Sequence, residues 1–190
     1  MPQGRIKVIT MWSHNPPTAH ASPPDATQFD SSQLAQTYRD SFVCELFAGI
    51  GALSTLLQQL GWTIALLCEI EPHLINLLSS RFLDAEVYFD IYHEPWLQWR
   101  EQGFVVLLVT AGIACQPFSN RGLRLHKADP RAYQSLKVCD AAVALGAVYI
   151  LLENVANFVD QDHIHGVFSV TLAYYQERGY LLTCVTTLRG

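Results

Sequence analysis

The stretch 42-FVCELFAGIGALSTLLQQLGWTIALLCEI-70 contains the two patterns that decide the fold. Phe42–Phe47 is a short apolar run, as expected of a buried strand, and a second run of this kind covers Thr63–Ile70. Between them the leucines recur at helical spacing, so that they share one face of a helix: Leu53, Leu56, Leu57 and Leu60. The stretch therefore predicts a strand, a glycine-containing loop, a helix and a second strand.

The same alternation continues toward residue 187. Further strands are predicted over Ala85–Phe89, Phe104–Thr110, Val148–Glu153 and Tyr180–Thr187. Helices are predicted from the stripe Leu74, Leu77, Leu78 and Phe82, and over Ala132–Ala147 and Ile164–Arg178. Strands that alternate with helices predict an α/β fold with a doubly wound, mostly parallel sheet. In such a sheet, ligand-binding residues gather beyond the carboxyl ends of the strands.

Length and composition predict one packed domain. Of the 190 residues half are hydrophobic and 15% are charged, which excludes a disordered or highly charged tail. The formal net charge of −5 argues against a uniformly basic DNA-coating protein. Basic residues are nevertheless concentrated between Arg121 and Lys137, where Asp129 is the one acid, so we expect an anion to bind there.

The first part of the chain differs from the rest. Five of the nine prolines fall within the first 24 residues, which predicts a flexible leader over residues 1–39 and a domain over 40–190. Five scattered cysteines without CxxC spacing indicate a reducing compartment and give no support for a metal site. Without a signal peptide or an apolar run of bilayer length, we expect an intracellular protein with no membrane partner.

Glycines and acids stand at the ends of the first three predicted strands. Gly49-x-Gly51 lets the backbone approach a ligand, Glu69 can accept hydrogen bonds from ribose hydroxyls, and Asp90 can accept from an adenine amino group. Ser54 replaces the third glycine of the dinucleotide fingerprint. We therefore expect a single nucleoside moiety, and a nucleotide-dependent oxidoreductase is disfavoured.

The next two strand ends carry a thiol and a carboxylate. Cys115 lies in a loop shortly before the basic stretch, and nearby cations favour the nucleophilic thiolate. The other four cysteines are interpreted as buried and structural: Cys44, Cys68, Cys139 and Cys184. Glu153 follows a buried strand, where a carboxylate either caps a helix or forms an ion pair, or holds and delivers a proton.

The order and spacing of these motifs resemble the catalytic half of the cytosine carbon-5 DNA methyltransferases, from about Val43 to Leu188. The matching positions are Phe47-x-Gly49-x-Gly51, Glu69, Asp90, Cys115-Gln116-Pro117-Phe118-Ser119, Asp129-x-Arg131 and Glu153-Asn154-Val155. The resemblance implies a Rossmann-like, S-adenosylmethionine-dependent methyltransferase fold. It also implies methyl transfer to carbon 5 of cytosine in DNA.

The resemblance assigns a role to each matching position. S-adenosylmethionine would be bound by Phe47, Ala48, Gly49, Ile50, Gly51, Glu69, Ile70, Asp90 and Ile91. Cys115 would attack carbon 6 of a cytosine flipped out of its duplex, Glu153 would bond the ring nitrogen and amino group, and Asn154 would help to shape the loop. Contacts to the nucleic acid would come from Gln116, Ser119, Arg121, Arg124, Lys127 and Arg131.

Two features depart from the family pattern. Ala114 stands where the family has a proline before the nucleophile. After Leu188-Arg189-Gly190 the family continues into a Gln-x-Arg-x-Arg motif, a target-recognition region and a closing helix. We expect these to be missing from this chain, so that the sequence is a fragment or a truncated gene product whose target recognition could come from a second chain.

Several hypotheses follow from this pattern. The first, which the intact Cys115 and Glu153 favour, is the catalytic half of a DNA cytosine methyltransferase that is active only with a missing segment or a partner chain. The others are a module that binds S-adenosylmethionine without turnover and a tRNA cytosine methyltransferase. We expect it in the nucleus if the source is eukaryotic and in the cytoplasm or nucleoid if it is bacterial.

Overall fold

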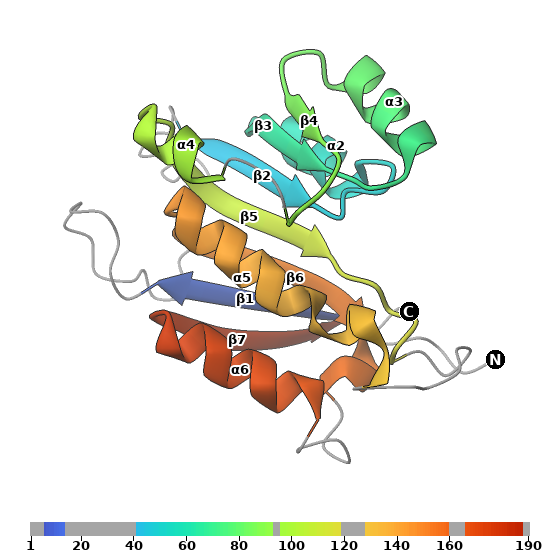
Figure 1. The fold of residues 1–190 in the computed structure, drawn as a ribbon, viewed down its shortest axis with the longest axis vertical. Helices are drawn as coiled ribbons and strands as arrows, with labels where there is room; N and C mark the ends of the chain where they lie inside the picture. Colours follow the sequence, from blue (N-terminus) through green and yellow to red (C-terminus); the bar gives the residue numbers. More distant parts are fainter. Residues whose placement is uncertain (1–5, 14–40, 93–95, 119–127, 160–165, 188–190) are drawn as a thin grey trace.

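The computed structural model of the chain describes residues 6–13, 41–92, 96–118, 128–159 and 166–187, and these build one seven-stranded sheet with the order β4-β3-β2-β5-β6-β1-β7 (Figure 1). The strands are β1 Ile6–Ser13, β2 Phe42–Leu46, β3 Thr63–Cys68, β4 Glu86–Tyr88, β5 Val106–Gly112, β6 Tyr149–Val155 and β7 Tyr180–Thr187. The five strands from β4 to β6 are mutually parallel, and β1 runs antiparallel to both β6 and β7.

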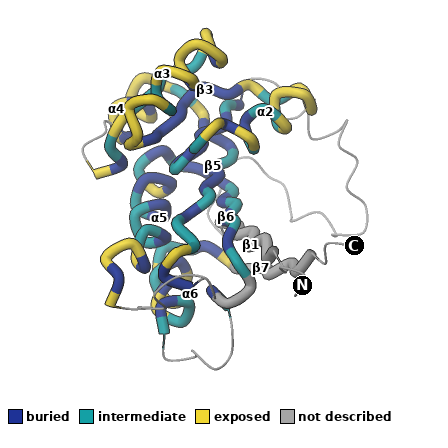
Figure 2. The backbone as a smooth tube through the Cα atoms, turned by 90° about the vertical axis from the view of Figure 1, so that its right-hand side faces the viewer, coloured by how far each residue is buried: buried dark blue, intermediate teal, exposed yellow. Residues whose placement is uncertain are grey.

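Helices cover both faces of this sheet. The α-helices are α2 Ala52–Gln59, α3 Pro72–Arg81, α4 Trp96–Glu101, α5 Gln134–Leu145 and α6 Val167–Glu177, with short 3-10 turns η2 Pro130–Tyr133 and η3 Ala156–Val159. In Figure 2, α4, α5 and α6 line one side of the strands and α2 lies on the other. The predicted α/β fold with a doubly wound, mostly parallel sheet is confirmed.

Two apolar clusters, one on each face, fix the layers. The larger joins α5 and α6 to the sheet through fully buried residues such as Val138, Ile150 and Tyr175. The smaller joins α3 to the other face through Leu78 and Phe82, together with strand residues from β2 and β3. Adjacent residues of β2 enter different clusters: Val43 belongs to the smaller one, and Cys44 belongs to the larger one. Successive side chains of a strand point to opposite faces.

The order of the parallel strands creates a switch point in the middle of the sheet. The first parallel strand is β2, and the next two, β3 and β4, are added on one side of it. The chain then returns to form β5 on the other side of β2. The carboxyl ends of β2 and β5 lie side by side, with Leu46 in register with Ala111. The loops that follow these two strands diverge there, and such a crevice is where open α/β sheets bind ligands.

The expectation of a flexible leader over residues 1–39 is wrong for Ile6–Ser13, which form β1 in the interior of the sheet. This segment, IKVITMWS, is rich in β-branched residues and free of proline, so it can supply hydrogen bonds to both neighbours. The proline content of the surrounding sequence concealed this short strand. Residues 14–40 of the expected leader lie outside the described residues.

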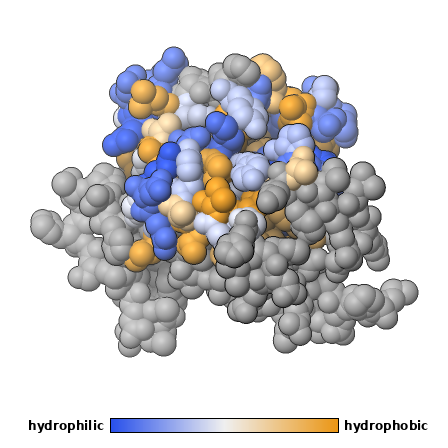
Figure 3. Space-filling model, turned by 60° about the horizontal axis from the view of Figure 1, so that its bottom comes forward, coloured by the Kyte–Doolittle hydropathy of each residue, from blue (hydrophilic) through white to orange (hydrophobic). Residues whose placement is uncertain are grey.

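Apolar and hydrophilic side chains alternate over the face seen in Figure 3, where small apolar groups are separated by hydrophilic ones. Among the described residues, no helix is both long and apolar enough to cross a membrane.

Candidate active site

The loop after β2 is held in an unusual backbone conformation at the switch point. Phe47, Gly49 and Gly51 all have positive φ angles, of 54°, 56° and 73°. A Cβ atom on Gly51 would lie 2.6 Å from Cε2 of Phe82, whereas a Cβ on Gly49 would meet nothing within 4 Å. Gly51 is therefore required for packing against α3, and Gly49 leaves open space above the loop.

Glu69, at the end of β3, fastens this loop to its neighbour. One carboxylate oxygen accepts a hydrogen bond from the N–H of Gly49 at 2.7 Å, and the other accepts from the N–H groups of Ile70 and Glu71 at 2.8 and 3.0 Å. The Ala48 N–H donates to the carbonyl of Cys68 at 3.0 Å. A carboxylate offers about four acceptor positions, so Glu69 retains capacity for one further donor.

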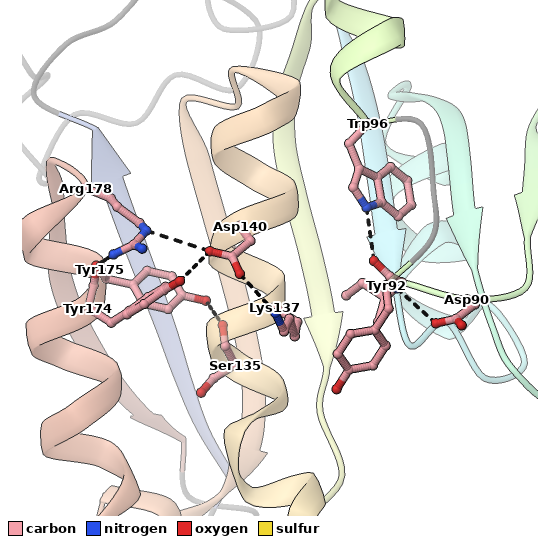
Figure 4. A network of polar contacts seen from close by, with 10 residues as sticks. Asp90, Tyr92, Trp96, Ser135, Lys137, Asp140, Tyr174, Tyr175 and Arg178 are labelled. Carbon is pink, nitrogen blue, oxygen red and sulfur yellow. Dashed lines mark hydrogen bonds and ion pairs between the residues drawn. The ribbon is translucent and has the colours of Figure 1, made fainter.

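The other residues predicted to hold a nucleoside surround the loop. Ile50 and Ile70 are exposed by 57% and 68%, which leaves two apolar side chains uncovered beside Gly49. Asp90 accepts a hydrogen bond from the N–H of Tyr92 at 2.9 Å, and the carbonyl of the buried Ile91 accepts from the Trp96 indole at 3.2 Å (Figure 4). These contacts fix the turn after β4 next to the carboxyl ends of β2 and β3.

Glu45, a buried acid inside β2, was not predicted from the sequence as part of the site. Its carboxylate accepts from the N–H of Ser54 at 2.9 Å and so holds the first turn of α2 against the strand. Burial raises the pKa of the Glu45 carboxyl, and hydrogen bonds from Ser54 partly offset this rise. A charged residue in an otherwise apolar strand, directly before a glycine loop, was the available signal.

The loop after β5 carries Cys115, and contacts from two neighbouring elements hold it. The N–H of Ala114 donates to Oε1 of Gln134, the first residue of α5, at 3.1 Å. The buried Asn154 amide donates to the carbonyl of Ile113 at 3.5 Å. Cys115 is a free thiol of intermediate exposure, and its carbonyl accepts from the N–H of Phe118 at 3.0 Å.

Glu153 lies on β6, next to the start of the Cys115 loop. In the register of β5 and β6 it stands opposite Gly112, and a Cβ on Gly112 would lie 3.8 Å from Oε2 of Glu153. The glycine thus leaves room for the Glu153 carboxylate over the end of β5. The structure brings Glu153, Asn154 and the Cys115 loop together at one edge of the sheet.

The position of α5, and with it Gln134, depends on α6. The hydroxyl of Tyr175 donates to the Ser135 carbonyl at 2.7 Å, and the Ser135 and Thr171 hydroxyls bond each other at 2.8 Å. Figure 4 shows a second polar group on the same two helices, in which the Asp140 carboxylate lies between Lys137 and Arg178. These bonds anchor the amino-terminal turns of α5 beside the loop that carries Cys115.

The residues predicted to contact nucleic acid are only partly described. Gln116 is exposed, and the Arg131 guanidinium forms two hydrogen bonds with the buried Asp129 carboxylate, at 3.0 and 2.7 Å. These bonds from Arg131 hold the pKa of the Asp129 carboxyl below its ordinary value. Four further predicted contacts lie outside the described residues: Ser119, Arg121, Arg124 and Lys127.

The remaining candidate places for chemistry lie elsewhere. A cavity of about 360 Å³, lined by Arg100, Phe104, Gly146, Tyr180 and neighbouring residues, sits at the opposite edge of the sheet, where the parallel strands begin. None of the predicted site residues lines it. Within the part of the chain that the structure describes, no group of three metal-ligating side chains occurs.

A doubly wound sheet with a glycine loop and acids around its switch point is typical of Rossmann-like nucleotide-binding folds. The fold matches that of a DNA modification methyltransferase encoded within an Escherichia coli prophage, with a TM-score of 0.59 and 20% identity over 72% of this chain and 38% of that one. It also matches an Entamoeba histolytica methyltransferase, with a TM-score of 0.54 and 22% identity over 73% of this chain and 44% of that one.

A family model of C-5 cytosine-specific DNA methylases matches residues 42–188, and the chain belongs to this family. Among curated relatives, the type II methyltransferase M.Eco47II of Escherichia coli is 29% identical over 63% of this chain and 28% of its own length. M.PspPI of a Psychrobacter strain is 28% identical over 75% of this chain and 33% of its own length. The chain thus spans about a third of the length of these relatives.

Proposed function

We propose that this chain is the catalytic half of a DNA cytosine methyltransferase that uses S-adenosylmethionine. The observation that carries the proposal is the meeting of two loops at the switch point: the glycine loop after β2 and the Cys115 loop after β5, beside Glu153. A nucleoside site and a nucleophile on adjacent strands are what transfer of a group from a nucleoside cofactor to a bound base requires.

The described residues fit the nucleoside part of the cofactor. Open space above Gly49 admits a ligand, the uncovered side chains of Ile50 and Ile70 can contact an adenine ring, and Glu69 retains capacity for a ribose hydroxyl. Phe47, Ala48 and Gly51 shape the loop, and Asp90 and Ile91 lie at the neighbouring strand end. When bound, S-adenosylmethionine would supply a methyl group on a sulfonium, and loss of that methyl group would leave a neutral thioether.

Cys115 and Glu153 perform the chemistry on the base. The Cys115 thiolate adds to carbon 6 of cytosine, which makes carbon 5 electron-rich enough to accept the methyl group. Glu153 in its protonated form donates to the ring nitrogen and accepts from the amino group, and so stabilises the negative charge that the addition places on the ring nitrogen. Once carbon 5 has lost its proton to water, the carbon–sulfur bond breaks, and Cys115 leaves as the thiolate.

Positioning depends on the contacts that hold the two loops. Asn154 and Gln134 fix the backbone on the amino-terminal side of Cys115, through the carbonyl of Ile113 and the N–H of Ala114. A proline at position 114 would restrict the backbone before Cys115, and Ala114 does not. The position of the Cys115 sulfur therefore depends more strongly on the hydrogen bonds from Asn154 and Gln134 than it would with a proline.

A labelled-methyl transfer assay tests the proposal, with DNA and tRNA as parallel substrates. Cys115→Ala removes the nucleophile, so we expect transfer to fall by on the order of 10³-fold or more, with cofactor binding retained in calorimetric titration. Cys139→Ala is the matched control, because Cys139 is buried in α5 and burial raises its pKa to about 12.

Each outcome of this assay decides between hypotheses. Transfer to DNA that depends on Cys115 supports the proposal, and transfer to tRNA alone identifies an RNA methyltransferase. Cofactor binding without transfer to either substrate identifies a binding module. A titration without measurable heat excludes all three.

A further inference from the structure

Strand β1 fills a place in the sheet that its position in the sequence does not explain. It comes before β2 in the chain, yet it lies between β6 and β7, the last two strands (Figure 1). Its residues pair along their whole length, from Ile6 opposite Val155 and Thr187 to Trp12 opposite Tyr149 and Leu181. A strand paired on both sides in this way is an integral part of the sheet and not an edge addition.

The end of β7 and the start of β1 are adjacent. Thr187 stands in register with Ile6, and opposite residues of antiparallel strands have Cα atoms about 5 Å apart. A strand that followed β7 through a hairpin would lie beside β7 and run antiparallel to it. That is the place and direction of β1.

The sequence at the start of β1 matches what the family is expected to carry after β7. The match of the family model ends at residue 188, just where a Gln-x-Arg-x-Arg motif is expected to follow. The chain begins Met1-Pro2-Gln3-Gly4-Arg5-Ile6-Lys7, which has Gln, Arg and a further cation at the same spacing, with Lys7 in place of the last arginine.

We infer that residues 3–13 are the motif and strand that the family carries after β7, encoded here ahead of β2, so that the element order of this chain is a circular permutation of its relatives'. On this inference the Gln-x-Arg-x-Arg motif is not missing from the chain but lies near its amino terminus. The place beside β6 is filled from within the chain, and a partner is not needed to supply this strand.

The permuted strand also brings positive charge to the catalytic edge. β1 starts where β6 ends, and Lys7 occupies the register position opposite Asn154, next to Glu153. Acids gather at this edge, among them Glu69, Asp90 and Glu153, so an anionic substrate needs cations there. Arg5 directly precedes the strand in sequence and adds a second cation to the motif.

Moving the segment within the chain tests the permutation. Residues 1–13 are deleted from the front and joined directly after Gly190, so that residues 188–190 and 1–5 form the connecting loop. We expect the relocated chain to unfold cooperatively with a Tm within about 4 °C of the parent. The shortened chain that contains only residues 14–190 should have a Tm at least about 10 °C below that of the parent.

Two outcomes of this comparison overturn the inference. If the deletion chain is as stable as the parent, β1 is not an integral strand. If the deletion is destabilised and the relocated chain does not recover, the place of β1 is not that of a strand after β7. Because these readouts need neither cofactor nor nucleic acid, they are independent of the proposed function.

A second measurement addresses the cations and rests on the proposed function. In the parent, Arg5→Ala with Lys7→Ala should weaken duplex DNA binding and reduce the slope of log K against log salt by about 1 for each phosphate that is no longer neutralised. Arg100→Ala, on α4 at the opposite edge, is the matched control and should leave the slope unchanged. An unchanged slope in the double variant contradicts the role of these cations, provided that the parent binds DNA.

Discussion

The parallel and the antiparallel parts of the sheet are built by different rules. In the parallel part, β2 to β6, a helix after each strand returns the chain to the side of the sheet where the strands begin. All of these strands therefore end on the opposite side, and the motifs at their carboxyl ends gather around the switch point. In the antiparallel part, β1 reaches its place from the far end of the chain, between β6 and β7. One part is local in sequence and the other is not.

This difference separates two contributions to the candidate site. The parallel part supplies the glycine loop, Glu69, the Cys115 loop and Glu153 through contacts between neighbouring units. The antiparallel part supplies the strand that closes the sheet next to β6 and the cation Lys7 at its start. Ile6–Ser13, which the sequence placed in a flexible leader, thus form a strand of the sheet beside the proposed catalytic residues of β6.

Breaking β1 in its middle should produce the largest effect. Ile9→Pro removes a backbone N–H from a strand paired with Leu152 on one side and Cys184 on the other, and we expect a loss of about 3 kcal/mol in the free energy of unfolding. Urea unfolding measures this loss. Ile9→Val, which keeps the β-branched residue, should cost less than about 1.5 kcal/mol; equal stability of the two variants would show that β1 contributes nothing.

The glycine loop of the parallel part offers the next largest effect. Gly51→Ala combines a positive φ with a Cβ placed 2.6 Å from Phe82, and we expect a loss of about 2–3 kcal/mol. Gly49→Ala has the same backbone cost without the clash, so about 1–2 kcal/mol is expected. Thermal and urea unfolding of both variants measure the difference, and equal losses would contradict the packing role of Gly51.

A hydrogen bond that joins the two parts has a smaller expected effect. The Tyr180 hydroxyl, at the start of β7, donates to the carbonyl of Ala147 before β6 at 2.7 Å, and both residues are buried. Tyr180→Phe leaves that carbonyl without this donor, and a loss of about 1–2 kcal/mol is expected in urea unfolding. The exposed Tyr133 is the control, and a Tyr133→Phe variant that loses as much would remove the distinction.

The smallest effect concerns the pH dependence of the parallel part. Burial raises the pKa of Glu45 in the folded state above its ordinary value of 4.5. Below that value both states are protonated; as the pH rises through the interval up to the raised pKa, the unfolded chain releases its proton first, and stability falls. Glu45→Gln lacks this loss, so the parent should lose stability relative to the variant as the pH rises above about 4.5. Urea unfolding across this range measures it, and parallel pH profiles would contradict the assigned pKa shift.

The parallel part could be predicted from the sequence because its signals are local. The predicted strand Tyr180–Thr187 agrees with β7, and Phe42–Phe47 exceeds β2 by one residue. The candidate site residues were predicted from their place after apolar runs. Glu45 and Gln134 were missed, because their roles depend on which strand and helix pack together, and neither stands at a strand end.

The sequence by itself determined the α/β class, the strand ends that carry the candidate residues and the family, because these follow from periodicity and short motifs within one stretch of chain. Only the tertiary structure decided where Ile6–Ser13 belong. Eight residues with no helical partner carry no local information about their neighbours. Their place is set by the open backbone hydrogen-bonding groups of β6 and β7, strands formed by the other end of the chain.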